Sequence, residues 1–406
     1  MQVNRRSFVM ALGAGLTLSA TSRLSFAQDS GPIRIGALNP ITGSGSPYGT
    51  GMQKMILAAG ETVNAAGGVL GRQIQVLAED SQTNPQAAVL AAKKLIEVNG
   101  VQAILGTWSS GVTLAVLPLC RAANIPILHV SGAPNLSDLS VTGGLAYRFH
   151  TPNGRTGRCY AEMCKRESFK RVATMAFNNA SGLGLTEGFA KAWKDMGNDL
   201  VEKVVYEPNQ ISYRSELMKV LAARPDAIVT GSYYADTTII MREWFQTGQK
   251  TRWIVPGHAS TPEFIKAVGP TVAEGVLTAD LVVAKDSPAY APYDEAYRKQ
   301  TGQAGESNIY AAMTWDMAIA LALAIEATGS GNMVEVNRNI RTVANPPGST
   351  VYSFAEGKKK LREGAKIDYD GASSILNFDE NGDITPDFGV YQIENGALVR
   401  KYTLRI

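Results

Sequence analysis

The chain is poor in cysteine and histidine, which excludes two common ways of stabilising or equipping a small exported domain. Its three cysteines are Cys120, Cys159 and Cys164, and its three histidines are scattered over 406 residues. Cys159 and Cys164 stand five residues apart in a predicted helix and so on different faces, which argues against a disulfide between them unless that helix is broken. Cys120 lies in an apolar stretch and is predicted to be a buried free thiol. No histidine has a neighbouring Cys or His partner, so the signature of a metal site is missing.

Net charge is also small. The chain has 39 Lys and Arg against 36 Asp and Glu, and its first 27 residues hold three arginines and no acid. Removing them leaves 379 formally neutral residues, which gives no support for a nucleic-acid or anionic-membrane partner. That length predicts two domains rather than one core. We expect no second apolar run of membrane-spanning length after the one at the N-terminus.

The N-terminus carries the most informative motif. Arg5-Arg6-Ser7-Phe8 precedes the apolar run of residues 9–20, and Ser25-Phe26-Ala27 ends it with small residues. About a dozen apolar residues are too few for the roughly 20 of a membrane-spanning helix. The pattern predicts a twin-arginine export signal, residues 1–27, cut between Ala27 and Gln28; an ordinary secretory signal with a chance arginine pair is the alternative. Either places the mature protein in the periplasm, away from ATP and NAD chemistry.

After residue 31 the sequence alternates strand and helix patterns. Asn84-Pro85 predicts a helix start, with Asn as N-cap and Pro in the first position. Asn395-Gly396 predicts a hairpin turn between residues 389–394 and 397–404. Alternating βα units predict an α/β fold of doubly wound, mostly parallel sheets in two similar lobes, with ligands beyond the carboxyl ends of the strands. A Gly/Pro/Thr-rich break at residues 151–154 separates the two runs.

No catalytic or cofactor motif persuades. Gly-x-Ser-x-Gly is absent at the serine- and glycine-rich loops, and Gly182-Leu183-Gly184 is only a fragment of a dinucleotide fingerprint. The run of residues 379–383, Asp-Glu-Asn-Gly-Asp, has its glycine at the wrong position for a calcium loop and is predicted to be a surface turn. We therefore expect no cofactor, no metal and no catalysis.

The loop Gly106-Thr107-Trp108-Ser109-Ser110-Gly111 follows a predicted buried strand and opens a helix. Free N–H groups and the positive end of the helix dipole favour an anion there, and two serines add hydroxyl donors. The loop therefore suits a ligand carboxylate. A plain helix N-cap is an equally good interpretation of the loop alone.

Several short motifs occur in the order and spacing of a known family. They are Pro40-Ile41-Thr42-Gly43, Tyr48-Gly49, Gly67 to Gly71, Gly106 to Ser110, Ser131 to Asn135, Gly231 to Tyr234, Asn377 to Asp383, and Phe388-Gly389-Val390. Over nearly all of residues 31–406 the chain resembles the periplasmic leucine/isoleucine/valine-binding proteins, the receptors of ATP-binding-cassette importers. The resemblance implies two lobes joined by three crossovers: lobe 1 from residues 31–148 plus 281–376, and lobe 2 from 149–280 plus 377–406.

The resemblance also implies ligand positions. Ser110, with Ser109 beside it, matches the serine that holds the ligand carboxylate, and Ala133 matches a residue that offers its backbone. Asn135 stands where the family usually has Thr. Tyr48 and Tyr233 match aromatic walls of the cleft.

Two departures re-polarise the implied pocket. Ser181 replaces a cleft tyrosine, and Gly257 stands where the family places the acid that pairs with the ligand ammonium. Either Asp280 or Asp236 reaches in and keeps an amino-acid ligand, or the ligand lacks an ammonium and is an amide, a urea-like compound or a carboxylate with His258 and Tyr233 at its far end. The sequence favours the second slightly.

The sequence thus predicts an exported, soluble and monomeric receptor that closes on a small ligand and docks on a membrane permease. Two other hypotheses stay open: a ligand-sensing receptor of the same fold, and an exported α/β hydrolase.

Overall fold

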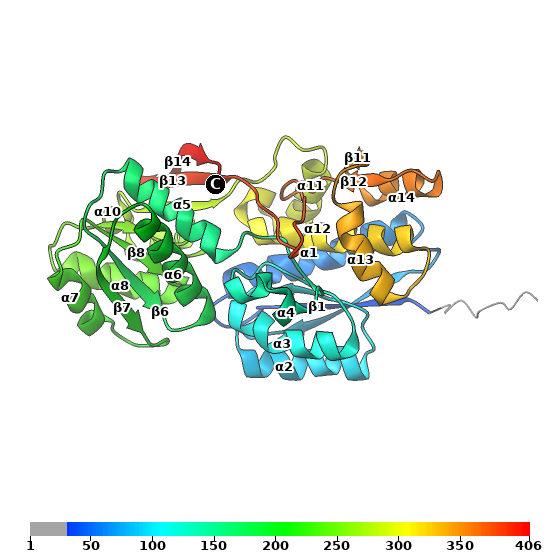
Figure 1. Ribbon diagram of the computed structural model, residues 1–406, viewed down its shortest axis with the longest axis horizontal. Coiled ribbons are helices and arrows are strands. Elements are labelled where there is room, and N and C mark those ends of the chain that lie inside the picture. The colour runs from blue at the N-terminus through cyan, green and yellow to red at the C-terminus, as the bar shows by residue number, and fades with distance from the viewer. Residues whose placement is uncertain (1–30) are drawn as a thin grey trace, which may run out of the picture. The chain divides into compact units, whose positions relative to one another are not determined.

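The computed structural model describes residues 31–406, and the predicted export signal lies outside them. The chain forms two large sheets whose strands are mostly parallel, as the alternating pattern predicts (Figure 1). The five-stranded sheet has the order β2-β1-β3-β4-β5 and is parallel throughout. Its strands are β1 Ile33–Asn39, β2 Ile74–Asp80, β3 Ile104–Thr107, β4 Ile127–His129 and β5 Ala146–Arg148.

The seven-stranded sheet has the order β14-β13-β10-β9-β8-β6-β7. Its strands are β6 Val172–Phe177, β7 Leu200–Tyr206, β8 Ala227–Gly231, β9 Arg252–Ile254, β10 Leu277–Leu281, β13 Phe388–Glu394 and β14 Ala397–Leu404. The strands from β6 to β10 run parallel, whereas β13 and β14 form the predicted antiparallel hairpin at one edge, drawn in red in Figure 1. The central strands β3 and β8 are buried along their whole length, as expected of parallel strands covered on both faces.

Helices link the parallel strands. Those between the strands of the five-stranded sheet are α1 Ser46–Ala65, α2 Pro85–Lys93, α3 Ser110–Ala123 and α4 Leu139–Thr142. Those that precede or link the strands of the seven-stranded sheet are α5 Asn153–Arg166, α6 Ala180–Asp195, α7 Arg214–Ala222, α8 Tyr234–Gln246, α9 Pro262–Val268 and α10 Pro270–Ala273. Asn84 caps α2 as predicted, since its side chain accepts a hydrogen bond of 2.9 Å from the N–H of Ala87.

The chain passes between the sheets three times, at residues 149–152, 282–289 and 370–387. Between the second and third passages lie α11 Tyr290–Thr301, α12 Ile309–Thr328, α13 Met333–Val343, β11 Ser349–Val351, α14 Phe354–Arg362 and β12 Ile367–Tyr369. Thr314 of α12 donates to the carbonyl of Met52 in α1 at 3.0 Å, so this segment returns to the five-stranded sheet. The sheets and crossovers agree with the predicted fold class; the exact lobe boundaries stay a prediction.

The expectation that no further apolar run reaches membrane-spanning length is wrong for α12. This helix has 20 residues with a mean hydropathy of 1.4, enough by length and composition to span a bilayer. Every residue from Tyr310 to Glu326 is buried inside the protein, because α12 packs between α1, α13 and α14. A helix that is apolar all round is then the central helix of the fold.

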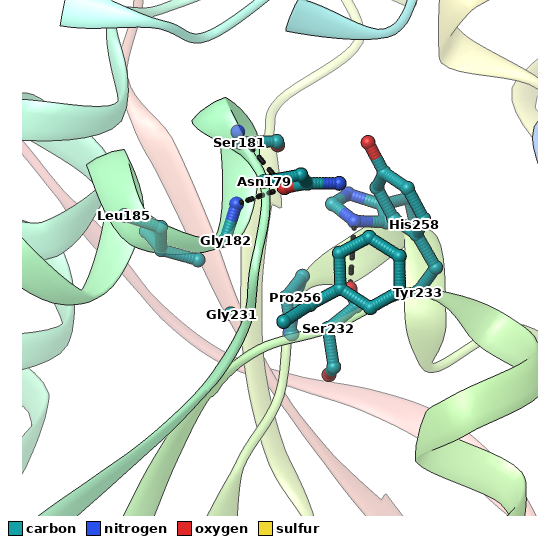
Figure 2. Close-up of a pocket in the computed structure, with 10 residues that line it drawn as sticks. Asn179, Ser181, Gly182, Leu185, Gly231, Ser232, Tyr233, Pro256 and His258 are labelled. Atoms are coloured by element: carbon teal, nitrogen blue, oxygen red, sulfur yellow. Dashed lines mark hydrogen bonds between the residues drawn. The ribbon is translucent and has the colours of Figure 1, made fainter. Parts of the chain in front are cut away.

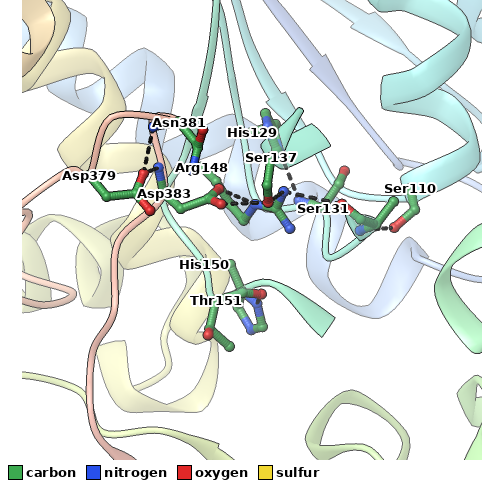
Figure 3. A network of polar contacts seen from close by, with 11 residues as sticks. Ser110, His129, Ser131, Ser137, Arg148, His150, Thr151, Asp379, Asn381 and Asp383 are labelled. Atoms are coloured by element: carbon green, nitrogen blue, oxygen red, sulfur yellow. Dashed lines mark hydrogen bonds and ion pairs between the residues drawn. The ribbon is translucent and has the colours of Figure 1, made fainter. Parts of the chain in front are cut away.

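The turn at residues 379–383 is part of the fold rather than the surface turn that the sequence predicts. Asp379 accepts hydrogen bonds of 2.9 Å from the N–H groups of Asn381 and Asp383, which closes the turn. Asp383 is 3% exposed and forms a 2.7 Å ion pair with Arg148, which is fully buried at the end of β5. The first and third crossovers are therefore joined by a buried charge pair (Figure 3).

All three cysteines are free and buried. Cys159 and Cys164 both lie in α5, and Cys120 lies in α3. Burial raises the pKa of the Cys120 thiol to about 12 and that of the other two further, so all three are inert thiols packed in the core.

Candidate functional site

An aromatic cluster lies where the two sheets face each other. Trp108 follows β3, Tyr48 belongs to α1, and Tyr310 opens α12. The Trp108 ring lies 5.9 Å from Tyr48 and 6.0 Å from Tyr310, and it reaches Tyr233 at the start of α8 at 5.2 Å and His258 after β9 at 5.5 Å. Loops at the carboxyl ends of strands in both sheets thus meet through these five rings, which we call the aromatic cluster. This is the position in which open α/β sheets bind ligands.

Tyr48 adds a polar link across the same gap. Its hydroxyl donates a 2.8 Å hydrogen bond to the main-chain carbonyl of His258. Burial, and then the nearby charge of Asp280, raise the pKa of Tyr48 well above its ordinary value. The phenol therefore stays a neutral donor and holds α1 against the loop that follows β9.

His258 presents a defined tautomer. Its Nε2 lies 3.1 Å from the carbonyl of Ser232, which can only accept, so Nε2 carries the proton. Burial lowers the pKa of His258 to about 4 even though Asp280 acts to raise it. At neutral pH the ring is uncharged, and its Nδ1 is free to accept a hydrogen bond.

Two adjoining cavities open beside the cluster, and both are lined by Ser181, Leu185, Pro256 and His258. The smaller encloses about 180 Å³ and lies between the start of α6 and the loops after β8 and β9 (Figure 2). The larger encloses about 380 Å³ and extends toward α5, β10 and β13. Its further lining residues are His150, Asn153, Thr156, Tyr160, Gly257, Ala279, Asp280, Tyr310 and Phe388.

Asn179 shapes the wall of the smaller cavity. Its side chain caps α6 by accepting from the N–H groups of Ser181 and Gly182 at 3.0 and 2.7 Å. Figure 2 shows Asn179 lying between this helix end and the His258 ring. Gly182 cannot carry a side chain here, since a Cβ would lie 2.5 Å from the carbonyl oxygen of Phe177.

Tyr233 joins the cavity wall to the five-stranded sheet. Burial raises the pKa of Tyr233, and interactions of its hydroxyl with the side chains of Ser109, Asn179 and Ser181 lower it in part. One phenol therefore touches the first residue before α3 and the start of α6. This places a donor and acceptor at the junction of the two halves of the site.

Of the two carboxylates that the sequence offers, only Asp280 lines a cavity. Its Oδ1 accepts from the N–H of Leu281 at 2.8 Å and lies 3.9 Å from Nε2 of His150. Asp236 is instead a structural group. It is 3% exposed, accepts a 2.9 Å hydrogen bond from the N–H of Tyr233, and pairs with the Tyr206 hydroxyl. Burial raises the pKa of Asp236 to about 6, although these hydrogen bonds favour the charged form.

The predicted anion end is assembled but lines neither cavity. Ser109 is the residue before α3 and makes no side-chain capping bond, which leaves first-turn N–H groups of α3 for another acceptor. The hydroxyl of Ser110 accepts from the N–H of Ala133 at 3.1 Å. Asn135 is exposed in the short turn after Ala133, so the structure does not bring it to the cavities.

Comparisons with known proteins agree with this geometry. A family model described as periplasmic binding protein matches residues 32–396. The chain belongs to the periplasmic binding protein family. Leu/Ile/Val-binding protein homolog 3 of Brucella melitensis is 26% identical over 374 residues, 90% of this chain and 93% of the relative. The resemblance seen in the sequence is thereby confirmed.

Solved structures of low identity share the fold of this periplasmic binding protein. A leucine binding protein from Thermotoga maritima superposes with a TM-score of 0.79 at 23% identity, over 92% of this chain and 99% of that one. A solute binding protein of R. palustris in complex with benzoate gives a TM-score of 0.73 at 18% identity, over 92% and 96% of the two chains.

Sequence reasoning missed part of the wall of this periplasmic binding protein. Trp108 stands in the loop singled out for its serines, and its aromatic ring at the end of a buried strand was an available signal. Tyr310 and His150 left no such signal. Tyr310 looks like one more apolar residue of a helix, and His150 lies in a crossover whose path depends on the tertiary structure.

Proposed function

We propose that this periplasmic binding protein captures a small carboxylate-bearing or amide-type ligand for an ATP-binding-cassette importer of the branched-chain amino-acid type. The observation that carries the proposal is the aromatic cluster, in which side chains from both sheets close around cavities of ligand size. Binding would stabilise the form in which Trp108 contacts Tyr233 and His258, because only that form surrounds the ligand from both sides. The closed form would dock on the permease as a monomer.

Binding without catalysis agrees with the polar contacts. Among residues 31–406, no printed hydrogen bond joins a serine hydroxyl to a histidine ring, which is the contact a hydrolase needs to activate its nucleophile. The relatives named above are binding proteins by their names. Turnover of esters or amides by the purified protein would contradict this part of the proposal.

A thermal-shift screen tests the proposal directly. The mature chain would be heated with amino acids, amides, urea, short carboxylates and aromatic acids. A ligand at about 100 times its dissociation constant is expected to raise the free energy of unfolding by roughly 2.7 kcal/mol. Failure of every member of the panel to stabilise the chain would contradict capture of this ligand class.

Ser110→Ala is expected to weaken binding by roughly 1–3 kcal/mol if the hydroxyl donates to a ligand carboxylate. The Ser110 oxygen already accepts from the buried N–H of Ala133, so its own proton is free to donate. The same contact predicts a second effect: losing it leaves that N–H without its partner and costs about 1–3 kcal/mol of stability. Calorimetry with a panel ligand and urea unfolding separate the two effects. Ser110→Thr, which keeps the hydroxyl, is the control. An unchanged affinity in Ser110→Ala would show that Ser110 only holds the Ala133 loop.

Export is tested independently of binding. Arg5→Lys combined with Arg6→Lys is expected to leave precursor in the cytoplasm, because a twin-arginine route depends on the pair. Cell fractionation and immunoblotting give the measurement, with the single Arg23→Lys variant as control. Normal export of the double variant would favour the general secretory route and leave a periplasmic location in place.

A further inference from the structure

We propose that the larger cavity receives an ammonium group and that Asp280 is its counter-ion. The ligand is then of the amino-acid class, with a positively charged nitrogen, and not a plain carboxylate, amide or urea-like compound. This inference rests on the proposed function, since it names the chemistry of the ligand bound at the same site.

The charge of the cavity walls gives the first argument. Asp280 is the one carboxylate among the residues that line the two cavities, and no lysine or arginine lines either. His258 is neutral at physiological pH, because burial lowers its pKa to about 4. The Asp280 side chain is 26% exposed. A carboxylate so enclosed is costly without a positive partner, and the described wall offers only His150 at 3.9 Å, the outer limit of an ion pair.

The hydrogen-bonding groups give the second. His258 presents Nδ1 as an acceptor, because its Nε2 proton is engaged with Ser232. The hydroxyl of Thr156 is buried without a partner and can accept as well. With Asp280 these make acceptors from three elements around one space. An ammonium brings three donors to such a wall, whereas a second carboxylate would be repelled by Asp280.

Gly257 explains how the carboxylate comes to be there. A Cβ on Gly257 would lie 2.3 Å from Oδ2 of Asp280 and 2.7 Å from its Cγ. A side chain at 257 and the Asp280 carboxylate thus compete for the same place. The strand register is the cause: Leu277 of β10 pairs with Ile254 of β9, and three residues further on the same register sets Asp280 beside Gly257. The acid missing from position 257 is supplied by the neighbouring strand.

Matched ligand pairs test the class of ligand. L-leucine and 4-methylpentanoate differ only in the ammonium, as do L-phenylalanine and 3-phenylpropanoate. Calorimetry on the mature chain is expected to show binding of an amino acid at least roughly 100-fold tighter than of its partner without nitrogen. Asp280→Asn is expected to abolish that preference and weaken the amino acid by a similar factor. Asp199→Asn, which removes an exposed carboxylate of the same charge, is the control and leaves binding unchanged.

Moving the acid gives the sharpest test. Asp280→Gly loses amino-acid binding, and adding Gly257→Asp to it is expected to recover at least tenfold of the loss, because the new carboxylate enters the same space. Gly257→Ala alone weakens binding through its clash with Asp280, yet is tolerated in the Asp280→Gly background. Recovery in the double variant also shows that the single variant is folded.

Each other outcome overturns the inference in a distinguishable way. Preferred binding of the nitrogen-free partners removes the ammonium but leaves solute capture standing. Unchanged binding in Asp280→Asn, with stability lowered as much as by His150→Gln, identifies a structural Asp280–His150 pair. Binding of no probe, in wild type or variants, overturns the inference together with the proposed function.

Discussion

Arg148→Met is expected to lower the free energy of unfolding by roughly 3–5 kcal/mol, because it leaves the buried carboxylate of Asp383 without its partner. Arg148 is fully buried and lies 2.7 Å from Asp383, which is 4% exposed in its side chain. The guanidinium also donates to the carbonyl of Ala133 and to the hydroxyl of Ser137, both at 3.1 Å. Figure 3 shows it between Asp383 on one side and the loop that leads to Ser110 on the other.

The directions of the two pKa shifts agree with this dependence. Burial lowers the pKa of Arg148, and the charge of Asp383 counteracts part of that effect. Burial raises the pKa of Asp383, and Arg148 acts to lower it. Each charge is costly in this place unless the other is present.

Urea unfolding of Arg148→Met, Asp383→Leu and the double variant measures the coupling. The double variant is expected to be less damaging than the two single changes added together, since it leaves no unpaired buried charge. Arg298→Met, which breaks the exposed pair with Asp294, is the matched control and is expected to cost under about 1 kcal/mol. Additive single effects at 148 and 383 would contradict a coupled pair.

Trp108→Ala is expected to have the largest effect on binding of any single change in the aromatic cluster. The Trp108 ring contacts Tyr48 and Tyr310 on one side and Tyr233 and His258 on the other, and the residue is 6% exposed. Removing a tryptophan at the centre of an interface typically costs 2 kcal/mol or more, so affinity is expected to fall at least roughly 30-fold. Stability is expected to fall by about 3–5 kcal/mol, as for other large buried side chains.

Calorimetry with a panel ligand and urea unfolding measure both effects. Trp315→Ala is the matched control, because Trp315 is 5% exposed in α12 and contacts Tyr293 rather than the cluster. It is expected to lose similar stability while keeping affinity. Trp108→Phe is expected to restore part of the binding. Equal losses of affinity in Trp108→Ala and Trp315→Ala would show that Trp108 acts through general stability alone.

The sequence by itself determined the features that depend on neighbours along the chain. The Asn395-Gly396 turn was readable because both residues adopt positive φ, 52° and 77°, as the tight hairpin turn requires. The N-cap at Asn84 and the bounds of helices such as Tyr290–Thr301 and Met333–Val343 follow equally from local chemistry and periodicity. Alternation of these elements then fixed the fold class, and with it the end of the sheets at which the site lies.

Only the tertiary structure decided which side chains meet there. Asp280 faces Gly257 because β10 and β9 are paired in one particular register, and nothing in the spacing of the two residues encodes that register. Arg148 finds Asp383 across 235 positions, and the apolar helix α12 is a buried core helix because three other helices surround it. Such pairings depend on how distant segments pack, and local propensity and periodicity do not determine that packing.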